Sequence, residues 1–206
     1  MRNKFILTCA AVAAFAAFVV APAASAGPVL TDSLGKSVAV GTEITGKNVN
    51  NVSFTGGFAV TCNSVDLTGK ITENIGNSIK WEVLIGGATF GGTGANGDCT
   101  TSFGAASVTA NSRLCFAASG KTDVVEITGC ATNPVTFTIN VTGMMPCKYN
   151  TAKVLGSHTT APMDAEMTFI EQEAKLEEGP AFCPVSGKID IVLALTTKTG
   201  GTLAIS

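Results

Sequence analysis

Residues 91–99, Gly-Gly-Thr-Gly-Ala-Asn-Gly-Asp-Cys, have the spacing of a loop that could bind phosphate. The glycines Gly92, Gly94 and Gly97 follow the G-x-G-x-x-G pattern, in which backbone amides cradle a dinucleotide. That motif needs a strand before it and a helix after it, whereas the residues that follow are rich in Thr, Ser and Gly. A calcium-binding nonapeptide would need Asp where Asn96 stands, and it works only as stacked repeats. We interpret the stretch as a turn beside a disulfide.

A run of acidic residues between positions 164 and 178 has the types that form paired carboxylates. Such pairs cleave glycosides or bind calcium. On a strand, residues two apart share a face, so Asp164 would point with Glu166, and Glu171 with Glu173. A glycosidase also needs a cleft lined with aromatic residues, and this chain has one Trp and one Tyr. We interpret the run as a charged face in contact with solvent.

His158 and Trp81 are the remaining side chains that suggest chemistry. His158, the only histidine, follows Ser157, but a Ser–His–Asp triad must meet in space and the chain has no G-x-S-x-G elbow. We expect His158 at the surface or at a strand edge, where His158→Ala would leave folding and activity unchanged. Trp81 could stack on a sugar, yet it stands in step with Ile79 and Val83, so we expect it in the core.

The cysteines predict disulfides. The chain has seven, and six remain once the apolar N-terminal run that contains Cys9 is removed on export. The single histidine and the lack of any C-x-x-C give no support to a zinc site. An even number of cysteines in an exported chain indicates disulfides, and six cysteines allow about 15 pairings. We favour the pairing in chain order, which is Cys62 with Cys99, Cys115 with Cys130, and Cys147 with Cys183.

The N-terminus predicts export. Residues 1–26 read as a secretory signal peptide: Arg2 and Lys4 are its positive region, Phe5–Val20 is apolar, and the segment ends in Ala-Ser-Ala. The apolar run is shorter than the roughly 20 residues that span a bilayer. We expect one secreted domain of residues 27–206, with no transmembrane segment after cleavage.

The charge balance argues against nucleic acid as a partner. Loss of the two basic residues of the signal peptide takes the formal charge from −2 to −4, and Arg113 is then the only arginine. Proteins that bind nucleic acid neutralise phosphates with clustered Lys and Arg, and this sequence has no such cluster.

Alternating apolar residues predict strands along most of the chain. Three stripes have period two, and each would bury one face of its strand: Ile79, Trp81, Val83 and Ile85; Val135, Phe137, Ile139 and Val141; and Ile189, Ile191, Leu193 and Leu195. Clusters of Gly, Asn, Ser and Thr separate the runs, and these connections are too short for helical crossovers. We predict an all-β fold, an antiparallel β-sandwich with Greek-key or meander connections, held by disulfides.

Residues 164–178 also have good helix propensity. Met167 and Phe169 alternate with polar neighbours, however, and this favours a strand that ends near Glu173 and is followed by a polar turn.

Several segments together resemble a group of small secreted, cysteine-containing, β-rich bacterial proteins of unassigned function. They are "GTEITGKNVNNVSF", "VTCNSVDLTGKITEN", "CTTSFGAASVTA", "CKYNTAKVLGSHTT" and "FCPVSGKIDIVLALTT" followed by "LAIS". The resemblance implies a secreted β-domain and transfers no site residue.

We expect no catalytic, cofactor-binding or metal-ligating residue in this sequence. Polar strand faces and loops rich in Thr, Ser and Asn favour a non-enzymatic extracellular structural or adhesion module, with a cell-surface polymer or another extracellular protein as partner. A carbohydrate-binding module, which needs exposed aromatic residues, is one alternative. A hydrolase that uses the carboxylates around residues 164–173 is the other.

Overall fold

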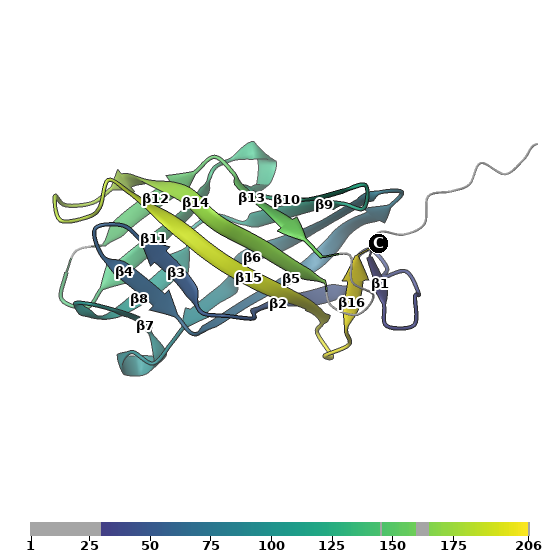
Figure 1. The fold of residues 1–206 in the computed structure, drawn as a ribbon, viewed down its shortest axis with the longest axis horizontal. Coiled ribbons are helices and arrows are strands. Elements are labelled where there is room, and N and C mark those ends of the chain that lie inside the picture. Colours follow the sequence, from purple (N-terminus) through teal and green to yellow (C-terminus); the bar gives the residue numbers. More distant parts are fainter. Residues whose placement is uncertain (1–29, 145, 160–164, 206) are drawn as a thin grey trace, which may run out of the picture.

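The chain folds into antiparallel strands, and the all-β class predicted from the sequence is confirmed (Figure 1). The computed structural model describes residues 30–144, 146–159 and 165–205. The signal peptide expected at residues 1–26 lies outside them. The strands are β1 (Leu30–Asp32), β2 (Glu43–Asn48), β3 (Val52–Thr55), β4 (Ala59–Cys62), β5 (Ser64–Ile75), β6 (Ser78–Gly91), β7 (Cys99–Thr101), β8 (Gly104–Ala110), β9 (Leu114–Ser119), β10 (Thr122–Gly129), β11 (Val135–Val141), β12 (Cys147–Thr151), β13 (Val154–His158), β14 (Glu166–Glu178), β15 (Ser186–Thr197) and β16 (Leu203–Ile205). The two 3-10 turns are η1 (Ala95–Gly97) and η2 (Cys130–Thr132).

The strand pairings close on themselves. Their order is β10-β13-β14-β12-β11-β8-β7-β4-β3-β15-β2-β5-β6-β9, and β9 pairs back to β10. The β14–β15 hairpin pairs across this circuit and divides it into two smaller rings. Each long strand of the hairpin serves both rings, because β15 pairs with β3 through residues 188–190 and with β2 through residues 193–197.

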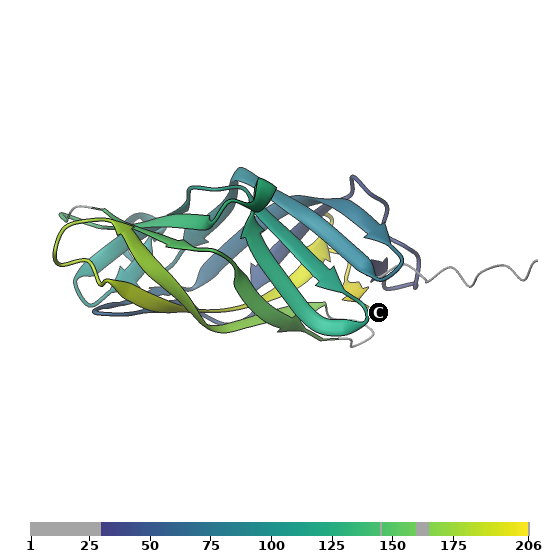
Figure 2. The ribbon, with the colours of Figure 1, turned by 90° about the horizontal axis from the view of Figure 1, so that it is seen from above.

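The two rings form two lobes of one elongated molecule (Figure 1). The proximal lobe contains β2, β5, β6, β9, β10 and β13, and the distal lobe contains β3, β4, β7, β8, β11 and β12. The chain alternates between them, and it crosses through residues 49–51, 63, 92–98, 111–113, 130–134 and 152–153. We call the region of these crossings the waist. In Figure 2 the strands lie in facing layers, a sandwich-like arrangement.

The three disulfides join the pairs that the sequence favours, and two of them fasten the waist. Cys62–Cys99 links the end of β4 to the start of β7, with the two Cα atoms 4.5 Å apart. Cys115–Cys130 links β9 to the turn after β10, with 5.0 Å between the Cα atoms. Cys147–Cys183 ties β12 to the β14–β15 loop at the far end of the distal lobe. Residues at which the chain changes lobe are thus held covalently.

A small ribbon of β1 and β16 closes the end of the proximal lobe. Leu30, Leu203 and Ile205 are almost completely buried there. Asn74 at the end of β5 holds the ribbon, since its Oδ1 accepts a hydrogen bond from the Leu30 amide at 2.9 Å and its Nδ2 donates to the Leu30 and Val38 carbonyls, both at 2.8 Å.

The apolar stripes predicted from the sequence form the core in most places. Trp81 is 2% exposed and stacks on Phe116 with 4.2 Å between ring centroids, which confirms its core position. Ile85 departs from its expected stripe and is 67% exposed. The ladder between β5 and β6 shifts register between Leu67 and Gly69, and the bulged residues of β6 leave the alternation.

The expectation that the strand at 164–178 ends near Glu173 is wrong. β14 continues to Glu178, because its backbone pairs with β15 up to Lys175 and with β12 beyond. A bulge interrupts it instead, where Glu171 has a φ of 53° and its amide donates to the Asp190 carboxylate at 2.6 Å. A polar stretch that the sequence pattern favours as a turn is therefore a bulged strand with a pairing partner on each edge.

Candidate functional site

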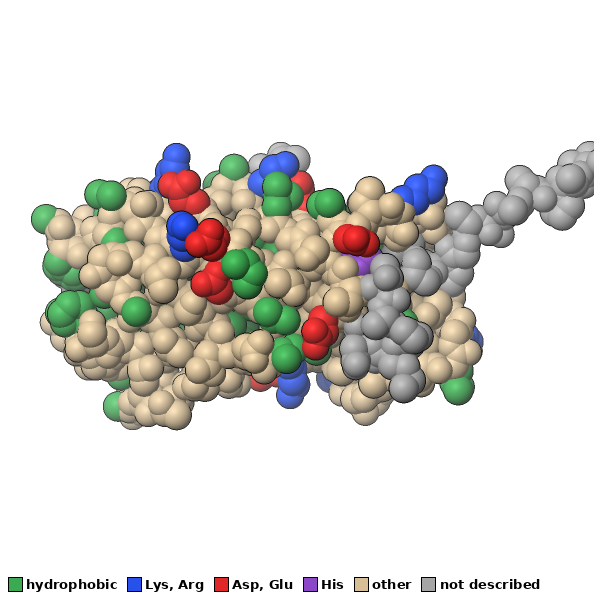
Figure 3. All heavy atoms as spheres, in the orientation of Figure 1, with side chains coloured by type: hydrophobic (Ala, Val, Ile, Leu, Met, Phe, Trp, Pro, Cys, Tyr) green, Lys and Arg blue, Asp and Glu red, His purple; other side chains and the backbone are tan. Residues whose placement is uncertain are grey.

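The distal end of the molecule exposes apolar side chains on uncharged loops. Four hairpin loops meet there, and their described residues contain no Asp, Glu, Lys or Arg: 56–58, 102–103, 142–144 with 146, and 179–185. Phe103 is 58% exposed, Met144 40%, Phe182 47% and Val185 81%. Figure 3 shows hydrophobic side chains gathered at this end, on the left, while the charged side chains in that view lie further along the molecule. We call these four side chains and their loops the distal surface.

A row of aromatic rings connects the distal surface to the interior of the distal lobe. Phe103 packs edge-on against buried Phe58 at 6.2 Å between centroids, and Phe58 lies 6.3 Å from Phe54. Phe54 in turn contacts Tyr149 at 4.8 Å. A Cβ at position 187 would collide with the Phe54 ring, so Gly187 is what lets β15 pass over it. The exposed Phe103 is therefore anchored to the core of the distal lobe.

The longest loop of the distal surface is also held in place. The disulfide Cys147–Cys183 fixes its middle, and the Cys183 amide donates to the Pro180 carbonyl at 2.9 Å. Pro184 lies against the β3–β4 loop so closely that a Cβ at Gly57 would come within 3.1 Å of its Cγ. Loops that are ordered before binding lose less conformational entropy when a partner arrives.

Tyr149 is a buried polar group beneath the distal surface. It is fully buried, and its hydroxyl has no hydrogen-bond partner within the described residues. Burial raises the pKa of the Tyr149 phenol to about 12, because the charged form is poorly solvated there. The phenol therefore stays neutral at physiological pH, and its ring acts as an apolar body stacked on Phe137.

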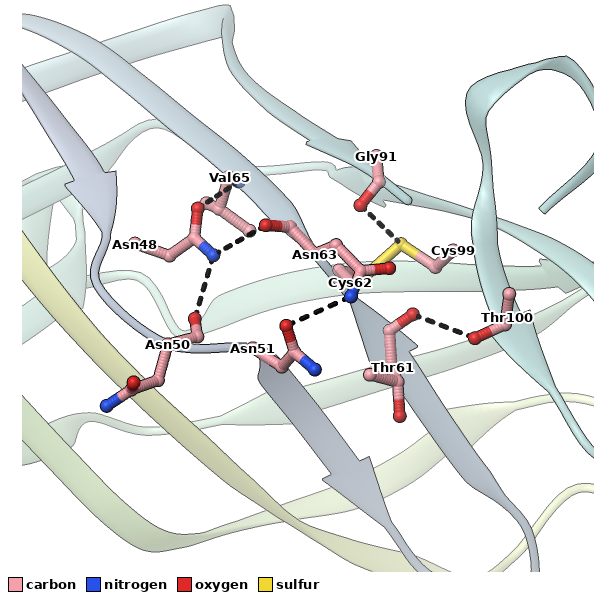
Figure 4. Close-up of a disulfide and its surroundings, with 10 residues drawn as sticks. All are labelled: Asn48, Asn50, Asn51, Thr61, Cys62, Asn63, Val65, Gly91, Cys99 and Thr100. Atoms are coloured by element: carbon pink, nitrogen blue, oxygen red, sulfur yellow. Dashed lines mark hydrogen bonds between the residues drawn. A yellow bond between two sulfur atoms is a disulfide. The ribbon is translucent and has the colours of Figure 1, made fainter. Parts of the chain in front are cut away.

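The glycine-rich stretch 91–99 is the crossing from β6 to β7, and its amides are used within the turn. The Gly92 amide donates to the Gly97 carbonyl at 2.8 Å, and the Gly94 amide donates to the Asp98 carbonyl at 2.9 Å. Asn96 lies in the left-handed region with a φ of 62°. The interpretation as a turn beside a disulfide holds, because the stretch delivers Cys99 to its partner (Figure 4).

An asparagine cluster organises the same crossing region (Figure 4). Asn48 Oδ1 accepts a hydrogen bond from the Val65 amide at 2.7 Å, while its Nδ2 donates to the carbonyls of Asn50 at 2.7 Å and Asn63 at 2.9 Å. Asn63 Nδ2 donates to Asn51 Oδ1 at 3.0 Å. These amides replace strand pairing where the chain leaves one lobe for the other, so their role is structural.

The acidic run lies on the outer face of the hairpin. Glu171 pairs with Lys188 at 3.0 Å, and Glu177 pairs with Lys148 at 3.1 Å. Glu173 is exposed. The bulge at Glu171 also breaks the two-residue alternation that would have aligned it with Glu173. Asp164 lies outside the described residues. The described acids match the expected solvated face.

Glu82, Cys115 and Cys130 form a cluster with metal-ligand atoms within 4.8 Å of one another. Both sulfurs belong to one disulfide, and Glu82 pairs with Arg113 at 2.8 Å. Metal binding requires thiolates, so the oxidised pair offers no such ligands.

The expectation that His158 lies at the surface or at a strand edge is wrong, because β13 pairs on both sides, with β10 and with β14. Its side chain is 5% exposed at the end of β13. His158 Nε2 lies 3.0 Å from the Ser119 carbonyl oxygen and 3.1 Å from the Thr122 carbonyl oxygen, which flank the β9–β10 turn. The Nε2–H donates to these carbonyls and ties the turn to β13.

Because of these contacts, we expect His158→Ala to destabilise the fold by about 1–3 kcal/mol, since the two turn carbonyls lose a shared donor and the buried ring leaves a void. Ser157→Ala, at the exposed neighbouring position, is the matched control and should change the free energy of unfolding by less than about 0.5 kcal/mol. Urea unfolding of both variants measures the difference. Equal stability of the two variants would show that the contacts of His158 do not stabilise the fold.

No protein-family model, curated protein or solved structure matches this chain. Within the described residues no helix has the length and apolar character needed to cross a membrane.

Proposed function

We propose that this chain is an exported, non-enzymatic binding module that attaches to another extracellular protein. Three disulfides support export, because such bonds form and persist in oxidising compartments. The N-terminal segment has the charge and apolar pattern of a secretory signal peptide. A protein that meets its partner outside the cell also benefits from a covalently fastened fold.

The observation that carries the proposal is the composition of the distal surface. Cores of protein–protein interfaces are poor in charged residues and rich in aromatic residues and Met. The distal surface exposes Phe103, Phe182 and Met144 on loops without a charge. Singly exposed apolar residues are ordinary, but four on adjoining, anchored loops form a patch suited to a partner.

The alternatives have less support from the same residues. A carbohydrate-binding module stacks sugars on exposed aromatic rings and binds their hydroxyls with charged or amide side chains. Phe103 and Phe182 are exposed, but their loops contain no Asp, Glu, Lys or Arg, while Trp81 is 2% exposed and Tyr149 is fully buried. A hydrolase based on the acidic run needs two carboxylates that face one pocket, whereas Glu171 is engaged with Lys188 on the outer face.

Site-specific photo-crosslinking in the producing cells tests the proposal. A photoreactive amino acid replaces Phe103 or Phe182, and a matched control places it at Ile75, which is 73% exposed in the proximal lobe. We expect one discrete, protease-sensitive adduct from each distal position and none from position 75. The adduct should form outside the cytoplasm, on chains whose cysteines are all oxidised.

Two outcomes would contradict the proposal. A heterogeneous adduct that resists protease and yields to glycan-degrading enzymes would identify a surface polymer as the partner. Absence of any adduct at positions 103 and 182, or free thiols on a cytoplasmic chain, would remove the binding module itself.

A further inference from the structure

The interior of the molecule contains a cavity at the waist. Its volume is about 120 Å³, and both lobes contribute to its lining. Phe90, Phe116 and Leu193 belong to the proximal side, and Val108, Phe137 and Ile189 belong to the distal side. Cys62 also lines it, so a waist disulfide forms part of the wall.

The cavity leaves inward-facing side chains incompletely packed. On β15, Ile189 and Ile191 alternate in step with Leu193 and Leu195 and therefore face inward. Leu193 is fully buried and Leu195 is 3% exposed, yet the two isoleucines, which line the cavity, are only partly buried. On β11, Phe137 is likewise partly buried, although its inward neighbour Ile139 is 1% exposed.

Close packing alone does not account for such a void. Protein interiors are as dense as organic crystals, and voids destabilise because the lining atoms lose contacts. The walls here cannot simply collapse inward, because closed strand ladders fix them. At the waist, Cys62–Cys99 also fastens strand ends of the distal lobe, and Cys115–Cys130 fastens those of the proximal lobe. Small-molecule sites are mostly apolar and largely preformed; the waist cavity shares both properties, although it is smaller than most such sites.

The lining defines the chemistry of the occupant. The side chains are aliphatic and aromatic, apart from Ser53, Thr136 and the disulfide-bonded Cys62, and the Ser53 hydroxyl is already bonded to Asp190 Oδ2 at 3.3 Å. A water molecule needs two to four polar partners, and comparable apolar cavities of about 150 Å³ stay dry and bind benzene. A charged or strongly polar molecule would lose its hydration without replacement.

We propose that the waist cavity is a binding site for a small, uncharged, apolar molecule about the size of a benzene ring. This site is separate from the distal surface, and it would operate with or without a protein partner there.

Calorimetric titration of the full chain, purified with its disulfides intact, tests the site with benzene as the probe. We expect saturable binding and a rise in melting temperature that grows with benzene concentration. Phenol, whose hydroxyl the lining cannot pair, should bind at least tenfold more weakly.

Variants that fill the cavity make the test specific. Val108→Phe places a ring in the cavity, and Ala110→Leu, also in the lining, is a second and smaller filling that guards against misfolding of the first. Both should weaken benzene binding at least tenfold, while Thr109→Val, on the exposed face of the same strand, should leave it unchanged. The site is refuted if benzene gives no saturable signal with the parent chain, or if both folded fillings bind it as tightly as the parent. The distal cross-linking result is independent of either outcome.

Discussion

Replacing Cys62 and Cys99 together by Ala should lower the free energy of unfolding by about 4 kcal/mol. The bond closes a loop with a sequence separation of 37, and restricting a loop of that length in the unfolded chain accounts for most of this value. The native state loses support as well, because the bond joins β4 to β7 at a lobe crossing and Cys62 lines the waist cavity. Guanidinium unfolding of the oxidised parent and the double variant measures the loss.

The third disulfide provides a matched control. Cys147 and Cys183 have a sequence separation of 36, so removing them by the same substitutions should cost about the same chain entropy. Their bond lies at the distal end and does not line the cavity. Benzene affinity should therefore fall in the Cys62/Cys99 variant and persist in the Cys147/Cys183 variant. A loss below about 1 kcal/mol for Cys62/Cys99 would show that the waist is held by its strand pairing alone.

Local pattern made the strands and the half-buried stripes predictable. The run Val135–Val141 predicts a strand, and β11 occupies those residues, because side-chain alternation is a property of the strand itself. The disulfide pairing was also predictable, since each bond joins two cysteines that follow one another along the chain. The stripe of β15 was visible in the sequence, but nothing there identifies its partners, because its two halves pair with different strands far away in the chain.

The errors arose where tertiary contacts override local pattern. His158 appears polar and isolated in the sequence, yet the carbonyls it binds are 36 and 39 residues away. Ile85 is in phase with Val83, but the β6 bulge turns it outward. A bulge is set by the partner strand, so the stripe alone cannot reveal it.

The sequence indicates the residues of the distal surface but not the cavity. The uncharged loops with Phe103 and Phe182 can be found in the sequence as apolar residues inside glycine-rich or proline-rich turns. Their convergence at one end depends on the folding of four hairpins. The cavity had no sequence signal, because Ile189 and Ile191 look like ordinary core residues until the two lobes are assembled around them.

Trp81→Ala should destabilise the protein by about 3–5 kcal/mol, the range for truncating a large buried aromatic residue. Trp81 stacks on Phe116, and Phe116 lines the waist cavity, so the lost indole removes the support behind one wall. Trp81→Phe keeps a ring against Phe116 and should cost less than half as much. Thermal and urea unfolding of both variants, followed by circular dichroism, measures the difference.

The same two variants also test whether the cavity wall formed by Phe116 depends on Trp81 for its packing, and whether added ligand can replace that packing. If the lost indole enlarges the space behind Phe116, Trp81→Ala should regain more stability than the parent when benzene is added, because the ligand fills volume that the side chain vacated. Trp81→Phe should respond like the parent. If the free energy of unfolding of Trp81→Ala lies within about 1 kcal/mol of that of the parent, the stacked Trp81–Phe116 pair is not a principal element of the proximal core. The cavity wall must then be held by the pairing of strands β6 and β9.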